Sequence, residues 1–295
     1  MIGSCRESAI STEEPLAGSA GSADFWFGIA WPKPHWDPLD AARSRGLPEA
    51  LARIASEPSV PPRRVAIRVF QRGPGASRDP VELVALETST GRSARVRRAP
   101  LDRLEPLMRS FLGGQSIGPP LQRPLLLVCS DGRHDRCCAL HGRRLFGALR
   151  RAAPAGLEVA ESSHLGGHRF APTVLVLPEG RLYGRLSPAD APMFLEAIES
   201  GRIPGTFDRG RISQSELAQL AEAAVRERVG DHASVRVEAA GPPVDGRPTA
   251  QLYVRTPSGR LEVRCRLREF CGRASCDAPE EPRSRWTVSA VEFVL

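Results

Sequence analysis

Four side chains in the middle of the chain have the types and spacing of ligands for a metal ion or an inorganic cluster. Cys129 and Cys138 lie nine positions apart, and His164 and His168 lie four positions apart within SSHLGGHRF. Cysteine thiolates and neutral imidazoles are the ligands that tetrahedral zinc and iron–sulfur clusters use. The glycine pair between the histidines favours a loop whose bare backbone can approach a cluster closely, not one face of a helix.

The elements that must position these residues follow the order β-α-β, a loop, then β-β-α. The apolar run before Cys129 is typical of a buried strand. A helix with arginines on one side and apolar residues on the other follows Cys138. The predicted ranges are strands at 125–128, 157–160, 173–177 and 181–186, and helices at 139–152 and 189–200.

Two stretches, VCSDGRHDRCCALHG and ESSHLGGHRFAPTVLVLPEGRLYGRL, resemble the sucrase/ferredoxin-like family, and the resemblance covers Leu125 to Ala197. It implies a thioredoxin-like ferredoxin domain with a [2Fe-2S] cluster held by two cysteines and by two histidines of an H-x-G-G-H-type loop. Carried over residue by residue, the implied cluster-binding and metal-binding residues are Cys129, Cys138, His164 and His168. The stretch around Pro172 is also similar to the thioredoxin segment in which a cis-proline opens the third strand.

Two positions depart from the family pattern. Cys137 and Cys138 are adjacent, and the family places its ligand three positions after the aspartate, here Asp135, so that Cys138 is the ligand and Cys137 the reserve candidate. His134 stands where the family commonly has arginine. A lone histidine is more often a surface or hydrogen-bonding residue, so we place His134 outside the site.

Charged residues near these motifs could support a cluster. Asp135 and Glu161 are candidate acceptors for the free N–H of a histidine ligand. Arg133, Arg136 and Arg169 could offset the charge of a cluster or bind a partner. Any one of these arginines is more often an ordinary surface residue, and the alternative for Asp135 and Glu161 is a capping or solvated side chain.

Turn-rich segments divide the chain into four parts. We predict a flexible tail at 1–22, an N-terminal α/β region at 23–118, the thioredoxin-like ferredoxin domain at 119–205 and a C-terminal α+β subdomain at 206–295. Three tryptophans between Asp24 and Pro38 indicate a packed strand rather than a ligand-facing loop. Ser213 and Glu216 form a predicted capping box for a helix that ends near Val229. The fold class is therefore α/β, with a small antiparallel subdomain at the C-terminus.

The other cysteines form a weaker pattern. Cys265, Cys271 and Cys276 have spacings of six and five with no nearby histidine, which makes a poor zinc site. Cys5 lies in the predicted tail, and we expect no role for it. No C-x-x-C occurs, so thioredoxin-type dithiol exchange lacks its usual pair.

Composition excludes several classes of function. The net charge of +7 comes from 41 basic and 34 acidic residues, but no basic run has the density expected of a nucleic-acid groove. The longest apolar run, LLLV, is far short of a membrane span. The first residues lack the pattern of a secretory signal, so we expect a cytoplasmic protein without nucleic-acid or membrane partners. No Gly-rich dinucleotide fingerprint follows a predicted strand.

These observations favour a [2Fe-2S] electron-transfer protein that acts with redox partner proteins and is an electron carrier rather than a substrate-converting enzyme. The alternative is a structural Cys2His2 zinc module in an interaction protein, because the same ligands suit zinc. A third hypothesis is a metal-free thiol enzyme that uses Cys137 or Cys138 with a histidine as base. The sequence identifies neither the electron donor and acceptor nor the oligomeric state.

Overall fold

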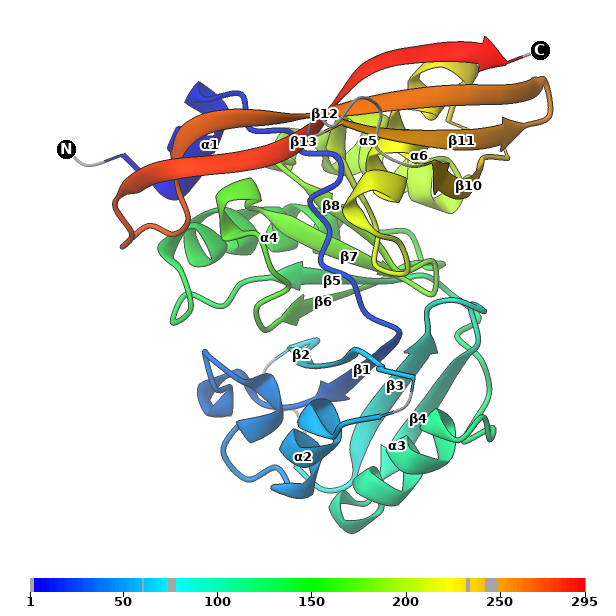
Figure 1. Ribbon diagram of the computed structural model, residues 1–295. Coiled ribbons are helices and arrows are strands. Elements are labelled where there is room, and N and C mark those ends of the chain that lie inside the picture. The colour runs from blue at the N-terminus through cyan, green and yellow to red at the C-terminus, as the bar shows by residue number, and fades with distance from the viewer. Residues whose placement is uncertain (1–2, 60, 74–77, 232–233, 242–248, 295) are drawn as a thin grey trace.

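A computed structural model describes residues 3–59, 61–73, 78–231, 234–241 and 249–294, which form two sheets and the helices that cover them (Figure 1). The helices are α1 (Cys5–Ser11), α2 (Ala50–Ser56), α3 (Leu104–Leu112), α4 (Arg143–Ala152), α5 (Ala191–Glu199) and α6 (Glu216–Val229). The large sheet contains β1 (Phe25–Ala30), β2 (Val65–Gln71), β3 (Val81–Glu87), β4 (Ser93–Ala99), β5 (Leu125–Cys129), β6 (Glu158–Ser162), β7 (Thr173–Leu177), β8 (Arg181–Gly184) and β9 (Asp208–Arg211). The small sheet contains β10 (Arg236–Gly241), β11 (Thr249–Thr256), β12 (Gly259–Arg273) and β13 (Glu280–Val294).

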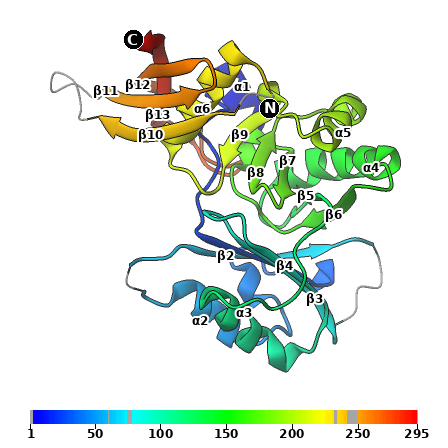
Figure 2. The ribbon, with the colours of Figure 1, turned by 90° about the vertical axis from the view of Figure 1, so that its right-hand side faces the viewer.

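The central part of the large sheet has the predicted order of elements. Strand β5 pairs in parallel with β6 and antiparallel with β7, and β7 pairs antiparallel with β8. Helices α4 and α5 lie side by side against one face of these strands (Figure 2). Both faces of β5 and β7 are covered, which explains why these strands are almost entirely apolar. The Ala171–Pro172 peptide bond is cis, as the thioredoxin resemblance implied.

The N-terminal region continues the same sheet. The strand order is β4-β3-β1-β2-β6-β5-β7-β8-β9, and β2 joins β6 through the pairs Phe70–Ser162 and Gln71–Glu161. Trp26, Trp31 and Trp36 are buried, so the prediction that this segment packs is confirmed. The predicted α/β class with a small C-terminal antiparallel sheet is also confirmed.

Two strands of the large sheet were not predicted. Strand β4 is rich in arginine, and Arg95 in it is buried, with its guanidinium in ion pairs with Glu82 and Glu158 at 2.7 and 2.6 Å. Strand β9 is short, and Arg209 in its centre is also buried. Because these side chains are charged, their burial could not be inferred from apolar alternation.

The C-terminal subdomain packs α6 against its four-stranded sheet and against β9. A buried ionic network fastens α6 to the large sheet, because Arg181 on β8 pairs with Asp208 on β9 at 2.6 Å and also with Glu222 on α6. The predicted capping box at Ser213 is wrong. The residue that caps α6 is Ser215, whose side chain accepts a hydrogen bond from the backbone N–H of Ala218.

The prediction that residues 1–22 form a flexible tail is also wrong for its described part. Helix α1 has a capping box, in which the Ser4 side chain and the Glu7 side chain each accept a hydrogen bond from the other residue's backbone N–H. It packs against β12 of the long β12–β13 hairpin, and the chain then descends to β1 (Figure 1). This arrangement buries Cys5 completely.

Gly142 sets the distance between the start of α4 and the end of β5. A Cβ atom at this position would lie 1.9 Å from the carbonyl oxygen of Cys129. We therefore expect Gly142→Ala to lower the free energy of unfolding by about 1–3 kcal/mol or more, because the backbone must move. Urea titration of wild type and variant in the same metal state measures the change.

Gly147→Ala is the matched control on the same helix. A Cβ atom there meets only the end of the Arg151 side chain, at 3.3 Å. We expect this variant to be more stable by about 0.5–1 kcal/mol, since alanine favours the helix. Equal effects of the two substitutions would contradict the proposed role of Gly142.

Candidate metal centre

Cys129 and Cys138 face each other across the end of β5. Cys129 is the last residue of that strand, and Cys138 begins a single π-helical turn (Cys138–Gly142) that leads into α4. Both side chains are buried. Because Gly142 has no side chain, this turn can approach the carbonyl of Cys129 and bring the two thiols together.

The electrostatics of this pair favour one thiolate. The hydrogen bond from Cys138, with that from His164, lowers the pKa of Cys129 against the effect of burial. The same interaction with Cys129 raises the pKa of Cys138, and burial adds to this. A thiolate is the form of cysteine that binds metal ions.

The histidine loop, which is the segment between β6 and β7 that carries His164 and His168, brings His164 to both cysteines. Its Nδ1 atom lies 3.7 Å from Sγ of Cys138 and 3.9 Å from Sγ of Cys129. Burial lowers the pKa of His164, which favours the neutral imidazole that metals bind. The His168 ring lies 5.4 Å from that of His164, between centroids, and its Nδ1 is 3.0 Å from the Asp135 carboxylate.

The backbone of the histidine loop is held by Arg209, which sequence analysis missed. Its guanidinium donates to the carbonyls of Gly166 and Ser19 at 2.9 and 2.6 Å and to the Ser19 hydroxyl at 2.9 Å. The positive φ of Gly167, 72°, suits glycine, and a Cβ atom there would lie 2.3 Å from Nη2 of Arg209. Arg209, Arg169 and Arg185 also contact the ring of Phe170.

His134, which we had placed outside the site, lies against it. Its ring stacks on that of His164 with 3.5 Å between centroids, and its Nδ1 is 2.6 Å from the carbonyl oxygen of Pro38. One ring nitrogen of each of His134, His164 and His168 lies within 4.8 Å of the others. The site therefore contains a third imidazole.

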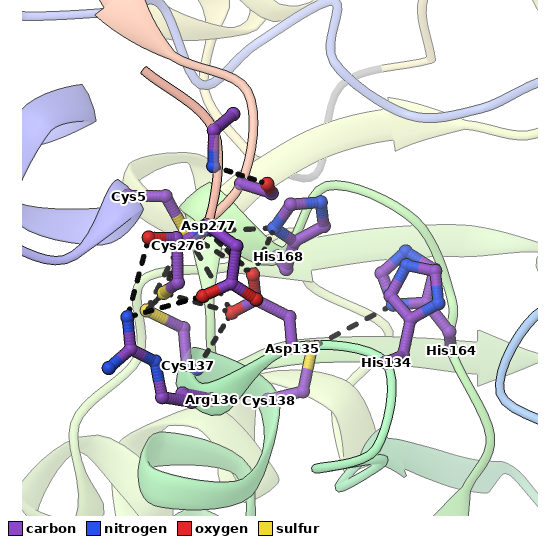
Figure 3. A network of polar contacts seen from close by, with 12 residues as sticks. Cys5, His134, Asp135, Arg136, Cys137, Cys138, His164, His168, Cys276 and Asp277 are labelled. Atoms are coloured by element: carbon purple, nitrogen blue, oxygen red, sulfur yellow. Dashed lines mark hydrogen bonds and ion pairs between the residues drawn. The ribbon is translucent and has the colours of Figure 1, made fainter. Parts of the chain in front are cut away.

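Cys137 points away from this pair of cysteines and into a second group of thiols (Figure 3). Cys5 from α1 and Cys276 from the loop between β12 and β13 lie beside it, with Asp135. The possible site at Cys265, Cys271 and Cys276 is not formed, since Cys265 is in the apolar core of the C-terminal subdomain and Cys271 is exposed. We expected no role for Cys5 because of its place near the start of the sequence. The structure instead places Cys5 beside Cys137, Cys276 and Asp135.

The two acidic residues expected to support a histidine ligand, Asp135 and Glu161, differ in what they bind. Asp135 accepts a hydrogen bond from His168, as expected, and also from the backbone amides of Cys137 and Cys276 at 2.8 and 3.0 Å. Burial alone would raise the pKa of Asp135, but these hydrogen bonds outweigh it and lower the pKa. Glu161 instead pairs with Lys33 at 2.5 Å.

The three arginines expected near the cluster bind protein groups. Arg133 donates to the carbonyl of Lys33 at 2.8 Å, and Arg136 donates to the carbonyl of Cys276 at 3.3 Å. Arg169 pairs with the buried Glu14 at 2.7 Å. Their direct contacts are therefore structural, and they join the site to the N-terminal and C-terminal segments.

The donor set of the first group fits a metal centre. Cys129, Cys138 and His164 each place a ligand atom within 4.8 Å of the other two. The Nδ1 of His168 binds a carboxylate, which leaves its Nε2 available, as in many histidine ligands of metals. Two thiols and two imidazoles are suitable donors for iron–sulfur clusters and for zinc.

The fold and this donor set define an α/β protein with a cysteine–histidine centre at the end of a sheet strand. A family model described as sucrase/ferredoxin-like matches residues 16–210, more than half of the chain, and the chain belongs to this family. The site lies within the matched residues, except for Cys5 and Cys276.

Individual relatives match shorter parts of the chain. Altered inheritance of mitochondria protein 32 from Eremothecium gossypii is 31% identical over 110 residues, which is 32% of this chain and 35% of the relative. The match thus spans about a third of that relative. A thioredoxin-like [2Fe-2S] ferredoxin from Aquifex aeolicus has 18% identity over 29% of this chain and 89% of its own, with a TM-score of 0.27. Its wild-type structure at 19% identity covers 29% of this chain and 95% of its own, also with a TM-score of 0.27.

The helices of the described residues were also compared with the requirements of a membrane span. None of them is long and apolar enough to cross a bilayer.

Replacing Arg209 tests whether its hydrogen bonds hold the histidine loop. We expect Arg209→Lys to lower the free energy of unfolding by about 1–3 kcal/mol, because an ammonium group cannot reach the carbonyls of Gly166 and Ser19 together and one is left unsatisfied. Denaturant unfolding measures the loss. Arg211→Lys, on the same strand, is the control, because Arg211 is partly exposed and its nearest carboxylate oxygen is 3.9 Å away. A change of about 0.5 kcal/mol or less is expected for it, and a similar loss in both variants would contradict the role of Arg209.

Proposed function

We propose that the chain binds a [2Fe-2S] cluster through Cys129, Cys138, His164 and His168 and carries electrons. The observation that supports this most directly is the convergence of Cys129, Cys138 and His164 within 4.8 Å, with His168 next to His164 and bound through its Nδ1 to Asp135. Such a cluster, when bound, accepts and donates one electron at a time, and imidazole ligands raise its reduction potential relative to four thiolates.

The structure favours Cys138 over Cys137 as the second cysteine ligand. The Cys138 thiol lies 3.7 Å from Nδ1 of His164, whereas that of Cys137 lies 3.3 Å from Sγ of Cys276. The two adjacent cysteines therefore serve different groups. This supports the spacing argument from Asp135.

The protein residues around the donors bury one side of the proposed centre and leave the other near the surface. Both cysteine side chains are fully buried, whereas the His168 side chain is 14% exposed and His134 and His164 are half-buried. Electron transfer to a partner would therefore take place on the histidine side. Redox partner proteins in the cytoplasm, rather than nucleic acids or membranes, are the partners we propose.

Anaerobic purification of the full chain tests the proposal. We expect about two irons and two acid-labile sulfides per chain, a visible absorption spectrum and an EPR signal after reduction. Cys138→Ser should lose the iron, because its thiol faces Cys129, and Cys137→Ser should keep it. A colourless, iron-free protein after cluster reconstitution would show that the proposed function is wrong.

Substitution of the proposed histidine ligands tests whether they raise the reduction potential of the cluster. We expect His164→Cys and His168→Cys to lower the midpoint potential by roughly 100 mV or more, because a charged thiolate replaces a neutral imidazole. Potentiometric titration measures this shift. His35→Ala is the control, since the His35 ring binds the guanidinium groups of Arg45 and Arg78, and it should keep the cluster and its potential. An unchanged potential in both cysteine variants would refute the histidine ligation.

The alternative is a structural zinc ion at the same residues. It is favoured by one observation, namely that three donor atoms within 4.8 Å could also surround a single ion. Zinc that replaces iron in the purified protein, and that is lost in Cys129→Ser, would establish this alternative.

A further inference from the structure

Three cysteines outside the proposed cluster ligands form a compact triangle. Sγ of Cys5 lies 3.6 Å from that of Cys137 and 3.5 Å from that of Cys276, and the last two are 3.3 Å apart. All three side chains are buried. They come from α1, from the loop before α4 and from the turn between β12 and β13, so the triangle joins three distant parts of the chain (Figure 3).

Asp135 provides a fourth donor on the same side. Its Oδ1 atom lies 3.2 Å from Sγ of Cys276 and 3.8 Å from Sγ of Cys5. Backbone amides of Cys137 and Cys276 hold this carboxylate at 2.8 and 3.0 Å. The ligand atoms of all four residues lie within 4.8 Å of one another.

We propose that Cys5, Cys137, Cys276 and Asp135 bind one zinc ion, at a site separate from the [2Fe-2S] ligands. Sulfur ligands at about 2.3 Å from a tetrahedral ion lie about 3.8 Å from one another, close to the separations in this triangle. In a [2Fe-2S] cluster each iron takes two protein ligands, so three sulfurs in mutual contact fit a single ion better.

Hydrogen-bond donors of the protein surround the sulfur atoms of this site. The side chain of His141 and the backbone of Arg6 hydrogen-bond to the thiol of Cys137. The backbone N–H of Cys5 donates to Cys276, and the guanidinium of Arg136 contacts the Cys276 carbonyl at 3.3 Å. Zinc binding would displace the protons that remain on the thiols, and the ion would take the place of the hydrogen bonds among them.

The proposed ion has a structural role. Without it, the three thiols are joined only by weak hydrogen bonds, beside the contacts that Asp135 and Arg136 make with the backbone of Cys276. A shared ion would link all three segments directly. Asp135 also binds His168, so the zinc site would stiffen the carboxylate that orients a proposed cluster ligand. The zinc proposal does not require that the cluster be present.

Metal analysis of the full chain tests this site. We expect one zinc per chain in the wild type, and X-ray absorption at the zinc edge should show about three sulfur ligands and one oxygen ligand. Cys5→Ser, Cys137→Ser and Cys276→Ser should each lose the zinc. Cys265→Ser and Cys271→Ser are matched controls that should keep it, because neither thiol reaches the triangle.

The two metal proposals fail separately. Cys129→Ser should lose iron and keep zinc, and Cys276→Ser should lose zinc. The iron and zinc contents of the wild type measure the occupancy of both sites without any substitution. Chelation of zinc should lower the melting midpoint of the wild type and leave that of Cys276→Ser unchanged. Wild-type protein that binds no zinc with its thiols reduced, zinc with fewer than three sulfur ligands, or a disulfide between two of the three cysteines would overturn the proposal.

Discussion

A single buried carboxylate connects the parts of the molecule on which its chemistry depends. Asp135 accepts hydrogen bonds from the imidazole of His168 and from two backbone amides, one beside α4 and one in the β12–β13 turn. A buried carboxylate is costly unless it is paired or hydrogen-bonded, so these three segments must reach it together. This requirement ties the C-terminal hairpin to a residue of the central domain.

The remaining segments of the site are held by arginine. Arg209 donates a hydrogen bond to the backbone of the histidine loop. Arg169 and Arg185 attach the same region to Glu14 of the N-terminal segment. All three guanidinium groups contact the ring of Phe170. A chain with a single lysine thus uses planar, multi-donor cations where several carbonyls must be bound at once. The positive charge counted in the composition is in part internal structure rather than a docking surface.

Local patterns in the sequence predicted the central elements well. The apolar run at β5, the helix after Cys138 and the hairpin of β7 and β8 all have a periodicity set by burial of one or both faces. Strand β4 escaped prediction because Arg95 is buried through ion pairs, which no hydrophobic pattern reports. The pair of Cys129 and Cys138 was found from its short spacing. Cys5 and Cys276 are 271 positions apart, and only tertiary structure could bring them to Cys137.

That separation has a consequence for biosynthesis. At about 5–20 residues per second, a ribosome makes Cys276 roughly 15–50 s after Cys5. During this interval the thiol of Cys5, and that of Cys137 once it has been made, exist without their partner from the C-terminal turn. Maturation of this corner of the protein must therefore follow translation, and it would be sensitive to the metal and oxidant levels that the nascent chain meets.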